Sequence, residues 1–267
     1  MVKIGKKEFP EKALIMGILN VTPDSFSDGG QYSSLDKALQ QAEAMIEAGV
    51  HVIDIGGEST RPGAEFVTAE DEINRIVPVI KAIKEKYDVL ISIDTYKTQT
   101  ARAALEAGAD ILNDVWAGLY DGQMMALAAE WQVPYMLMHN QEDEGYEDIT
   151  AEVLAFLKER TQVALDAGIT KENIWIDPGY GFAKSAQDNI DLLKSLEQIT
   201  ALDYPVLFGI SRKRTVVSLL DGETDIAERD QATAALSAYA IMKGVQMVRV
   251  HNVDANRAVV KVINQLI

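Results

Sequence analysis

The chain has 267 residues and no cysteine, and 48% of its residues are hydrophobic. This length allows one large domain, and the lack of cysteine excludes disulfides, thiolate nucleophiles and zinc sites built on cysteine. The 25 basic and 41 acidic residues give a formal net charge of −16, which disfavours nucleic acid and anionic membranes as partners. The sequence has no long apolar run and no signal-peptide pattern, so we expect a cytoplasmic protein.

Short apolar, β-branched segments alternate along the chain with segments of helical periodicity. The predicted strands cover residues 14–21, 52–55, 89–93, 111–115, 134–138, 174–176, 206–210 and 247–250. The helix predicted after the first strand carries its apolar stripe at Leu35, Ala38, Leu39, Ala42, Met45 and Ile46. The same alternation continues to the end of the chain without a linker or a low-complexity segment.

Eight strand–helix pairs predict parallel strands that close into a single (β/α)8 TIM barrel. The barrel domain is predicted over residues 14–267, and the short segment 1–13 is predicted to cap its bottom. A doubly wound open sheet is the alternative. We favour the barrel because the count is eight and because no Gly-x-Gly-x-x-Gly turn follows the first strand.

Polar residues follow each predicted strand at its C-terminal end, where the active site of such a barrel lies. These residues are Asn20, Thr60, Arg61, Asp94, Asn113, His139, Asn140, Asp177, Ser211, Lys213, Arg249 and His251. Side chains two positions apart on a strand share a face, so Arg249 and His251 point together, as do Ser211 and Lys213. Any one position also has a structural explanation, as Asp177 has in its Asp-Pro-Gly turn signal. Together, the basic groups predict a local site for an anionic small molecule on an acidic protein.

Seven motifs, in this order along the chain, resemble the dihydropteroate synthase family. They are MGILNVTPDSFSDGG, IDIGGESTRPGA, ISIDTYK, ILNDVWAG, IDPGYGFAK, SRK and RVHNV, and they span roughly residues 14–253. The resemblance implies a transferase of folate biosynthesis that condenses (7,8-dihydropterin-6-yl)methyl diphosphate with 4-aminobenzoate to 7,8-dihydropteroate and pyrophosphate. It also implies a Mg²⁺ cofactor, a homodimer and a target of sulfonamides.

The resemblance places the pterin at Asp94, Asn113, Asp177 and Lys213. The Asp177 carboxylate suits the row of N–H donors on the pterin, and the Asn113 amide can donate and accept at once. The catalytic residues expected from the resemblance are Asp28, Asp94 and Lys213. The reaction leaves positive charge on the methylene carbon, which Asp28 and Asp94 would stabilise, and the arylamine itself is the nucleophile.

The resemblance also implies contacts for the diphosphate, the metal and the arylamine. The diphosphate contacts are Thr60, Arg61, Arg249 and His251, and the Mg²⁺ ligand is Asn20. Mg²⁺ usually binds through few protein ligands together with substrate phosphates and water, so one amide oxygen suffices. The expected slot for 4-aminobenzoate consists of Phe26, Pro62, Phe182 and Ser211. The long polar loops after residues 20 and 56 are typical of lids that exclude water.

Three residues receive no carried-over role. Many family members read Ser-Arg-Lys-Ser where this chain has Arg214, which either binds the aminobenzoate carboxylate, leaves it to backbone N–H groups, or points to solvent. His139 is unassigned, and His51, at the start of a strand, is interpreted as structural.

Two rival functions are open at this stage. A pterin-binding methyltransferase has no diphosphate to hold, so the Thr60-Arg61-Pro62, SRK and Arg249-His251 segments disfavour it. A catalytically silent relative that only binds pterin or a partner is disfavoured because the implied metal, pterin and diphosphate positions are all filled.

Overall fold

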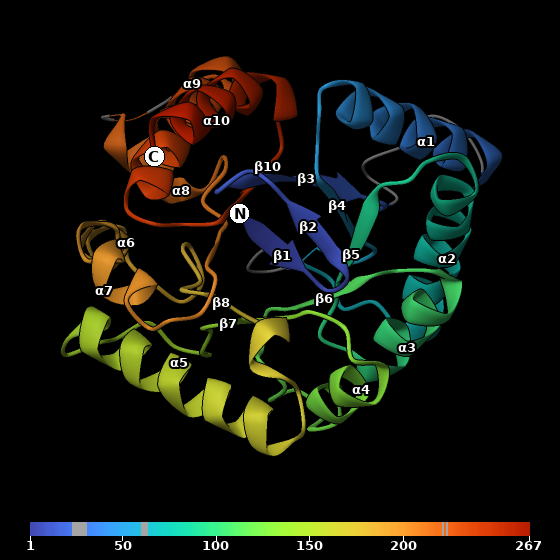
Figure 1. Cartoon of the computed structure of the whole chain (residues 1–267), viewed down its shortest axis with the longest axis horizontal. Coiled ribbons are helices and arrows are strands. Elements are labelled where there is room, and N and C mark those ends of the chain that lie inside the picture. Colours follow the sequence, from blue (N-terminus) through green and yellow to red (C-terminus); the bar gives the residue numbers. More distant parts are fainter. Residues whose placement is uncertain (23–30, 60–63, 221, 223) are drawn as a thin grey trace.

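The computed structural model describes residues 1–22, 31–59, 64–220, 222 and 224–267. Its centre is an eight-stranded parallel sheet in the order β8-β7-β6-β5-β4-β3-β10-β9. The strands are β3 (Leu14–Asn20), β4 (Val52–Gly56), β5 (Leu90–Asp94), β6 (Ile111–Asp114), β7 (Tyr135–Met138), β8 (Ile174–Asp177), β9 (Leu207–Phe208) and β10 (Met247–Val250). A bridge between Ile176 and Val206 joins the two ends of this order, so the predicted (β/α)8 barrel is confirmed (Figure 1).

Helices surround the strands on the outside of the barrel (Figure 1). They are α1 (Gln31–Glu47), α2 (Ala69–Lys86), α3 (Thr98–Ala107), α4 (Met124–Trp131), α5 (Ile149–Asp166), the 3-10 helix η2 (Lys171–Asn173), α6 (Ala186–Lys194), α7 (Leu196–Thr200), α8 (Arg214–Leu219), α9 (Ile226–Met242) and α10 (Val253–Leu266). Within the described ranges, none of them has the length and apolar character needed to cross a membrane.

The strand residues divide by parity between two apolar clusters. One cluster fills the inside of the barrel and contains Leu14, Met16, Val52, Leu90, Ile111, Met136, Trp175, Leu207 and Met247. The other packs the strands against the helices and contains Ile15, Ile53, Ile91, Leu112, Leu137, Ile176, Phe208 and Val248. Because side chains alternate between faces, later residues of the first parity also point inward, closer to the C-terminal ends. This rule aims Asn20, Asp54, Asp94, Asn113, Asp177 and Arg249 into the barrel.

A hairpin of β1 (Val2–Ile4) and β2 (Lys7–Phe9) precedes the barrel, with Val2 opposite Phe9. Val2 and Ile4 are buried and belong to the cluster inside the barrel. In Figure 1 the hairpin lies across the end of the barrel that faces the viewer. The boundary between a cap of residues 1–13 and a barrel domain of residues 14–267 remains a prediction.

The strand predicted over 206–210 is too long, since β9 contains only Leu207 and Phe208. At Gly209 the chain leaves the sheet where two polar side chains approach it. A Cβ at this glycine would lie 3.5 Å from Asp177 Oδ2 and 3.9 Å from Arg249 Cδ. The missing side chain therefore leaves space between these two groups.

Candidate active site

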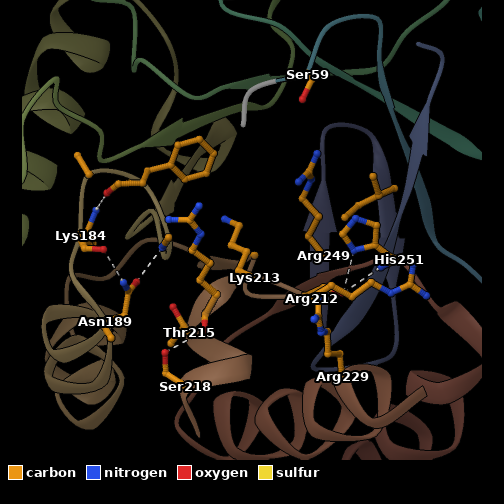
Figure 2. Close-up of a pocket in the computed structure, with 18 of the residues that line it drawn as sticks. Ser59, Lys184, Asn189, Arg212, Lys213, Thr215, Ser218, Arg229, Arg249 and His251 are labelled. Atoms are coloured by element: carbon orange, nitrogen blue, oxygen red, sulfur yellow. Dashed lines mark hydrogen bonds between the residues drawn. The ribbon is translucent and has the colours of Figure 1, made fainter. Parts of the chain in front are cut away.

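A pocket of about 1110 Å³ opens where the C-terminal ends of the strands meet. Its lining includes Asn20, Asp94, Phe182, Lys184, Ser211, Arg212, Lys213, Arg214, Arg229, Arg249 and His251. Figure 2 shows Lys213, Arg249 and His251 arranged around this space. Although the chain has a net charge of −16, cationic side chains outnumber carboxylates among the described residues of the lining. The pocket is therefore suited to an anion.

Arg249 on β10 reaches across the inside of the barrel to two carboxylates. Its Nε donates to Asp54 Oδ2 at 2.6 Å, and its Nη2 donates to Asp94 Oδ2 at 2.5 Å. Asn113 Nδ2 donates to the same oxygen of Asp54 at 3.1 Å. Burial opposes the charge of Arg249, but the two carboxylates raise its pKa overall, so the guanidinium stays charged. The three strands β4, β5 and β10 are thus joined beneath the pocket by one ionic network.

Each carboxylate of this network has one oxygen that accepts no hydrogen bond from the described residues. Asp54 Oδ1 and Asp94 Oδ1 are buried and accept no hydrogen bond from the part of the chain that the structure describes. Burial raises the pKa of the Asp94 carboxyl, while the neighbouring Arg249 acts against this rise. Buried polar atoms in proteins are nearly always paired, so these oxygens are available to a donor from water, from a ligand or from a residue outside the described ranges. At Asp94, which lines the pocket, a ligand N–H is a suitable donor.

Asp177 and Lys213 form a second charged group in the site. Asp177 Oδ1 accepts from the Gly179 N–H at 2.7 Å, and burial raises the pKa of this carboxyl against the effect of Lys213. Lys213 Nζ donates to the Tyr180 carbonyl at 2.5 Å and lies 4.3 Å from the centre of the Phe182 ring. Burial lowers the pKa of Lys213 to about 8, although Asp177 raises it in part. A carboxylate and an ammonium thus share this side of the site.

Ser211 and His251 meet at the rim. The Ser211 Oγ lies 3.0 Å from His251 Nδ1 and accepts from the His251 backbone N–H at 3.2 Å. Between Ser211 and Lys213, Arg212 adopts a left-handed φ of 59°. Its guanidinium donates twice to Asp230 on α9, at 2.6 and 2.7 Å. This bidentate pair holds the turn that presents Ser211 and Lys213.

The structure brings most of the predicted site residues together. Asn20, Asp94, Phe182, Ser211, Lys213, Arg249 and His251 line the one pocket, and Asn113 and Asp177 are buried beside it. Phe26, Asp28, Thr60, Arg61 and Pro62 lie outside the described residues. Arg214 is exposed at the start of α8 and also lines the pocket. His51 accepts from the Ile15 N–H at 3.0 Å.

Sequence reasoning missed three residues of the site. Asp54 lies inside a strand and not at its end. It lies two positions after the inward-facing Val52, so the alternation of side chains along a strand predicts that Asp54 also points into the barrel. Lys184 binds backbone carbonyls and His139, and Arg212, which lies in a turn, binds Asp230 on α9. No spacing rule reveals these partners.

The described residues offer few protein ligands for a metal ion. Within the described ranges, no group of three or more His, Asp or Glu residues is arranged to hold a metal. The Asn20 amide lines the pocket, and a Cβ at Gly56 would lie 3.6 Å from its Oδ1. The glycine therefore keeps space open around that oxygen, which fits an ion held mainly by ligand oxygens and water.

Comparison with known proteins agrees with this geometry. Residues 16–251 match the family described as pterin binding enzyme. The chain is 67% identical to the dihydropteroate synthase of Streptococcus pyogenes serotype M6 over 265 residues, which is 99% of this chain and 100% of the relative. A Clostridium difficile dihydropteroate synthase structure with pteroic acid is 40% identical, with a TM-score of 0.92 and coverage of 100% and 99%. A Xanthomonas albilineans dihydropteroate synthase structure with 4-aminobenzoic acid is 41% identical, with a TM-score of 0.90 and coverage of 95% and 93%. The resemblance inferred from the seven motifs is confirmed, and the chain belongs to the pterin-binding enzymes and, within them, to the dihydropteroate synthases, the transferases of folate biosynthesis that join a dihydropterin methyl diphosphate to 4-aminobenzoate.

Proposed function

We propose that the pocket at the C-terminal ends of the strands condenses (7,8-dihydropterin-6-yl)methyl diphosphate with 4-aminobenzoate, using the residues described above. The observation that carries this proposal is the convergence of Asp94, Lys213, Arg249 and His251 around one cavity, with Asp177 buried beside it. The arylamine nitrogen bonds to the methylene carbon as the C–O bond breaks. The electron pair of that bond leaves with pyrophosphate, and the product nitrogen loses one proton.

The pterin is assigned to the buried polar groups. Asp177 faces the row of N–H donors, since a charged carboxylate accepts such a pair strongly. The Asp94 Oδ1 atom, which accepts no hydrogen bond from the described residues, is a second acceptor for the ring. Asn113 and Lys213 supply donors for the ring oxygen and nitrogen atoms. The pterin would thereby supply a donor to a buried oxygen that accepts none from the described residues.

The diphosphate is assigned to Arg249 and His251, with Thr60 and Arg61 as further predicted contacts. Arg249 Nε and Nη2 already donate to Asp54 and Asp94, which leaves its Nη1 group for the anion. Because the two carboxylates fix the plane of the guanidinium, this group needs little reorganisation to bind phosphate. A preorganised cation favours the charge that develops on the departing diphosphate.

Mg²⁺ is proposed as the cofactor, with the Asn20 oxygen as its protein ligand. When bound, the ion would neutralise negative charge on the diphosphate. The open space at Gly56 beside the Asn20 oxygen supports this assignment.

The arylamine is assigned to the side of the pocket lined by Phe182 and Ser211, with Phe26 and Pro62 as further predicted contacts. The Phe182 ring beside Lys213 provides an apolar face for an aromatic acid. Asp94, together with the predicted Asp28, would stabilise positive charge on the methylene carbon. Exclusion of water at this stage would protect that carbon from hydrolysis.

A cytoplasmic homodimer is the assembly that we propose. Support comes from apolar side chains exposed on neighbouring helices, with Met242 of α9 exposed by 68% and Leu266 of α10 by 74%. Sedimentation of the purified protein tests this part.

The test of the function is pyrophosphate release by the purified protein with Mg²⁺. We expect release only when both substrates are present, and loss of release when EDTA removes the metal. Release from the pterin substrate alone would indicate hydrolysis. Binding of pterin without release under any condition would favour the silent relative.

A further inference from the structure

Lys184 is a buried lysine at the end of the loop that follows β8. It is 6% exposed. Three acceptors surround its ammonium: His139 Nδ1 at 2.9 Å, the Gly179 carbonyl at 3.0 Å and the Phe182 carbonyl at 3.1 Å. An ammonium has three N–H donors, so these contacts use all of them. Lys184 therefore holds the loop of residues 178–184 from within.

The protonation of His139 suits this arrangement. Burial, together with the charge of Lys184, lowers the pKa of the His139 ring to about 3. The imidazole is therefore neutral near pH 7, and its Nδ1 is able to accept. Burial also lowers the pKa of Lys184 to about 7, and the Asp177 carboxylate opposes this shift, so the ammonium with its three donors is the main form below this pH.

A second set of contacts, made by α6, fixes the same loop. Asn189 on α6 accepts from the Gly181 N–H at 2.7 Å and donates to the Lys184 carbonyl at 3.1 Å (Figure 2). At Gly179, where φ is +74°, a Cβ would lie 2.0 Å from the His139 carbonyl oxygen. The loop thus lies directly on the end of β7 and has no room to shift toward it.

This loop contacts two of the residues assigned to the pterin. Its Gly179 N–H donates to Asp177, and its Tyr180 carbonyl accepts from Lys213. A Cβ at Gly181 would lie 2.8 Å from Lys213 Cδ, so the backbone also supports the lysine stem. A displaced loop would therefore move Asp177 and Lys213 together.

We propose that Lys184 is a positioning residue of the condensation, whose ammonium fixes the 178–184 loop so that Asp177 and Lys213 meet the substrates in the reactive orientation. This inference rests on the proposed function of the pocket. Lys184 itself does not act on the reacting atoms, because its three N–H groups point to His139 and to the loop carbonyls.

The first test is Lys184→Met, which keeps an unbranched side chain and removes the ammonium. We expect KM to rise by about tenfold or more for both substrates, at a temperature where circular dichroism shows the variant to be folded. Lys194→Met on α6 is the matched control, since that side chain is 69% exposed. It should keep both KM values within about twofold of the wild type. Wild-type KM values in Lys184→Met, with only a lower melting temperature, would overturn the proposal.

A chemical rescue separates the ammonium from its volume. Because the chain has no cysteine, Lys184→Cys introduces a single thiol. In the unfolded variant, the thiolate displaces bromide from 2-bromoethylamine and forms a C–S bond, which gives a thioether analogue of lysine. Alkylation with 1-bromopropane gives the same shape without the charge.

After refolding, recovery of both KM values in the aminoethylated protein alone supports the proposal. Recovery in both alkylated proteins overturns the proposal. Recovery in neither also overturns it, provided that wild-type protein taken through the same unfolding and refolding steps keeps its KM values. A wild-type protein that releases no pyrophosphate would refute the proposed function instead, so the two failures are distinguishable.

Discussion

Replacing Asp54 with Asn would remove a fully buried negative charge from the network of Arg249. Asp54 is fully buried and accepts from Arg249 at 2.6 Å and from Asn113 at 3.1 Å. Removal of one partner from a buried ion pair usually costs about 3–5 kcal/mol, because the other charge stays buried. Asp94 still pairs with Arg249 after this change, and the new amide oxygen still accepts. We therefore expect the lower end, a loss of about 3 kcal/mol in the free energy of unfolding.

Urea denaturation followed by circular dichroism measures this loss. With a slope of about 3 kcal/mol per molar urea, the midpoint should fall by about 1 M. Asp88→Asn is the matched control, because its pair with Lys7 is 2.7 Å long but Asp88 is 92% exposed. The control midpoint should hardly move, since exposed pairs contribute little. Equal midpoints for Asp54→Asn and Asp88→Asn would refute the view that this network stabilises the barrel.

A double-mutant cycle shows whether the loss belongs to the pair. Arg249→Met alone leaves Asp54 and Asp94 buried without their guanidinium and should also destabilise. If the two groups interact as the geometry indicates, the double variant should lose less than the sum of the single losses. Additive losses would mean that Asp54 acts through Asn113 or through packing.

The remaining predictions concern the ligands and pH. Asp177→Asn places a donor against the N–H row of the pterin, so calorimetry should show affinity for the pterin diphosphate reduced by about 2–4 kcal/mol. Unchanged affinity would remove Asp177 from the pterin site. His251→Ala should weaken binding of pyrophosphate more than binding of a pterin without diphosphate, and equal losses would contradict a phosphate contact. Burial lowers the pKa of Lys213 to about 8, so its ammonium is lost as pH rises through this value. Pterin affinity should therefore fall above about pH 8 in the wild type and stay flat in Lys213→Met, and parallel curves would exclude Lys213 as the cause. Burial lowers the pKa of His139 from 6.5 to about 3, so below pH 6.5 the unfolded chain binds a proton here that the folded chain does not. As the pH is lowered from 6.5 to about 3, the free energy of unfolding should therefore decrease, by up to about 1.4 kcal/mol per pH unit from this group. The same slope in His139→Gln would contradict the assignment.

The fold was predictable because its signal is local. Alternating strands and helices and a count of eight specify a barrel, and the strand ends then identify where polar side chains converge. The limits of β9 were not predictable in the same way. Its apolar run continues to Ile210, but the strand ends at Phe208, just before Gly209, which lies beside Asp177 and Arg249.

The pairing inside the site was not predictable from local patterns. Arg249 lies 195 positions from Asp54 and 155 from Asp94, so only the closed barrel brings them together. Reading strand ends alone overlooked Asp54, although a carboxylate within an otherwise apolar strand is rare without a partner. The role of Lys184 was even harder to predict from the sequence, because two of its acceptors are backbone carbonyls, which every residue carries.

The arrangement of charge inside the barrel follows the charge separation of the reaction. Departure of pyrophosphate leaves negative charge on the leaving group and positive charge on the methylene carbon. Asp54 of β4 is fully buried, and Asp94 of β5 lines the pocket together with Arg249 and His251. Arg249 interacts with both kinds of group, since two of its nitrogens pair with Asp54 and Asp94 while the residue also lines the cavity. A single guanidinium thereby allows two sets of groups to lie close together in one buried site: carboxylates that stabilise the positive carbon, and basic groups that bind the diphosphate. Neither set would be stable there alone.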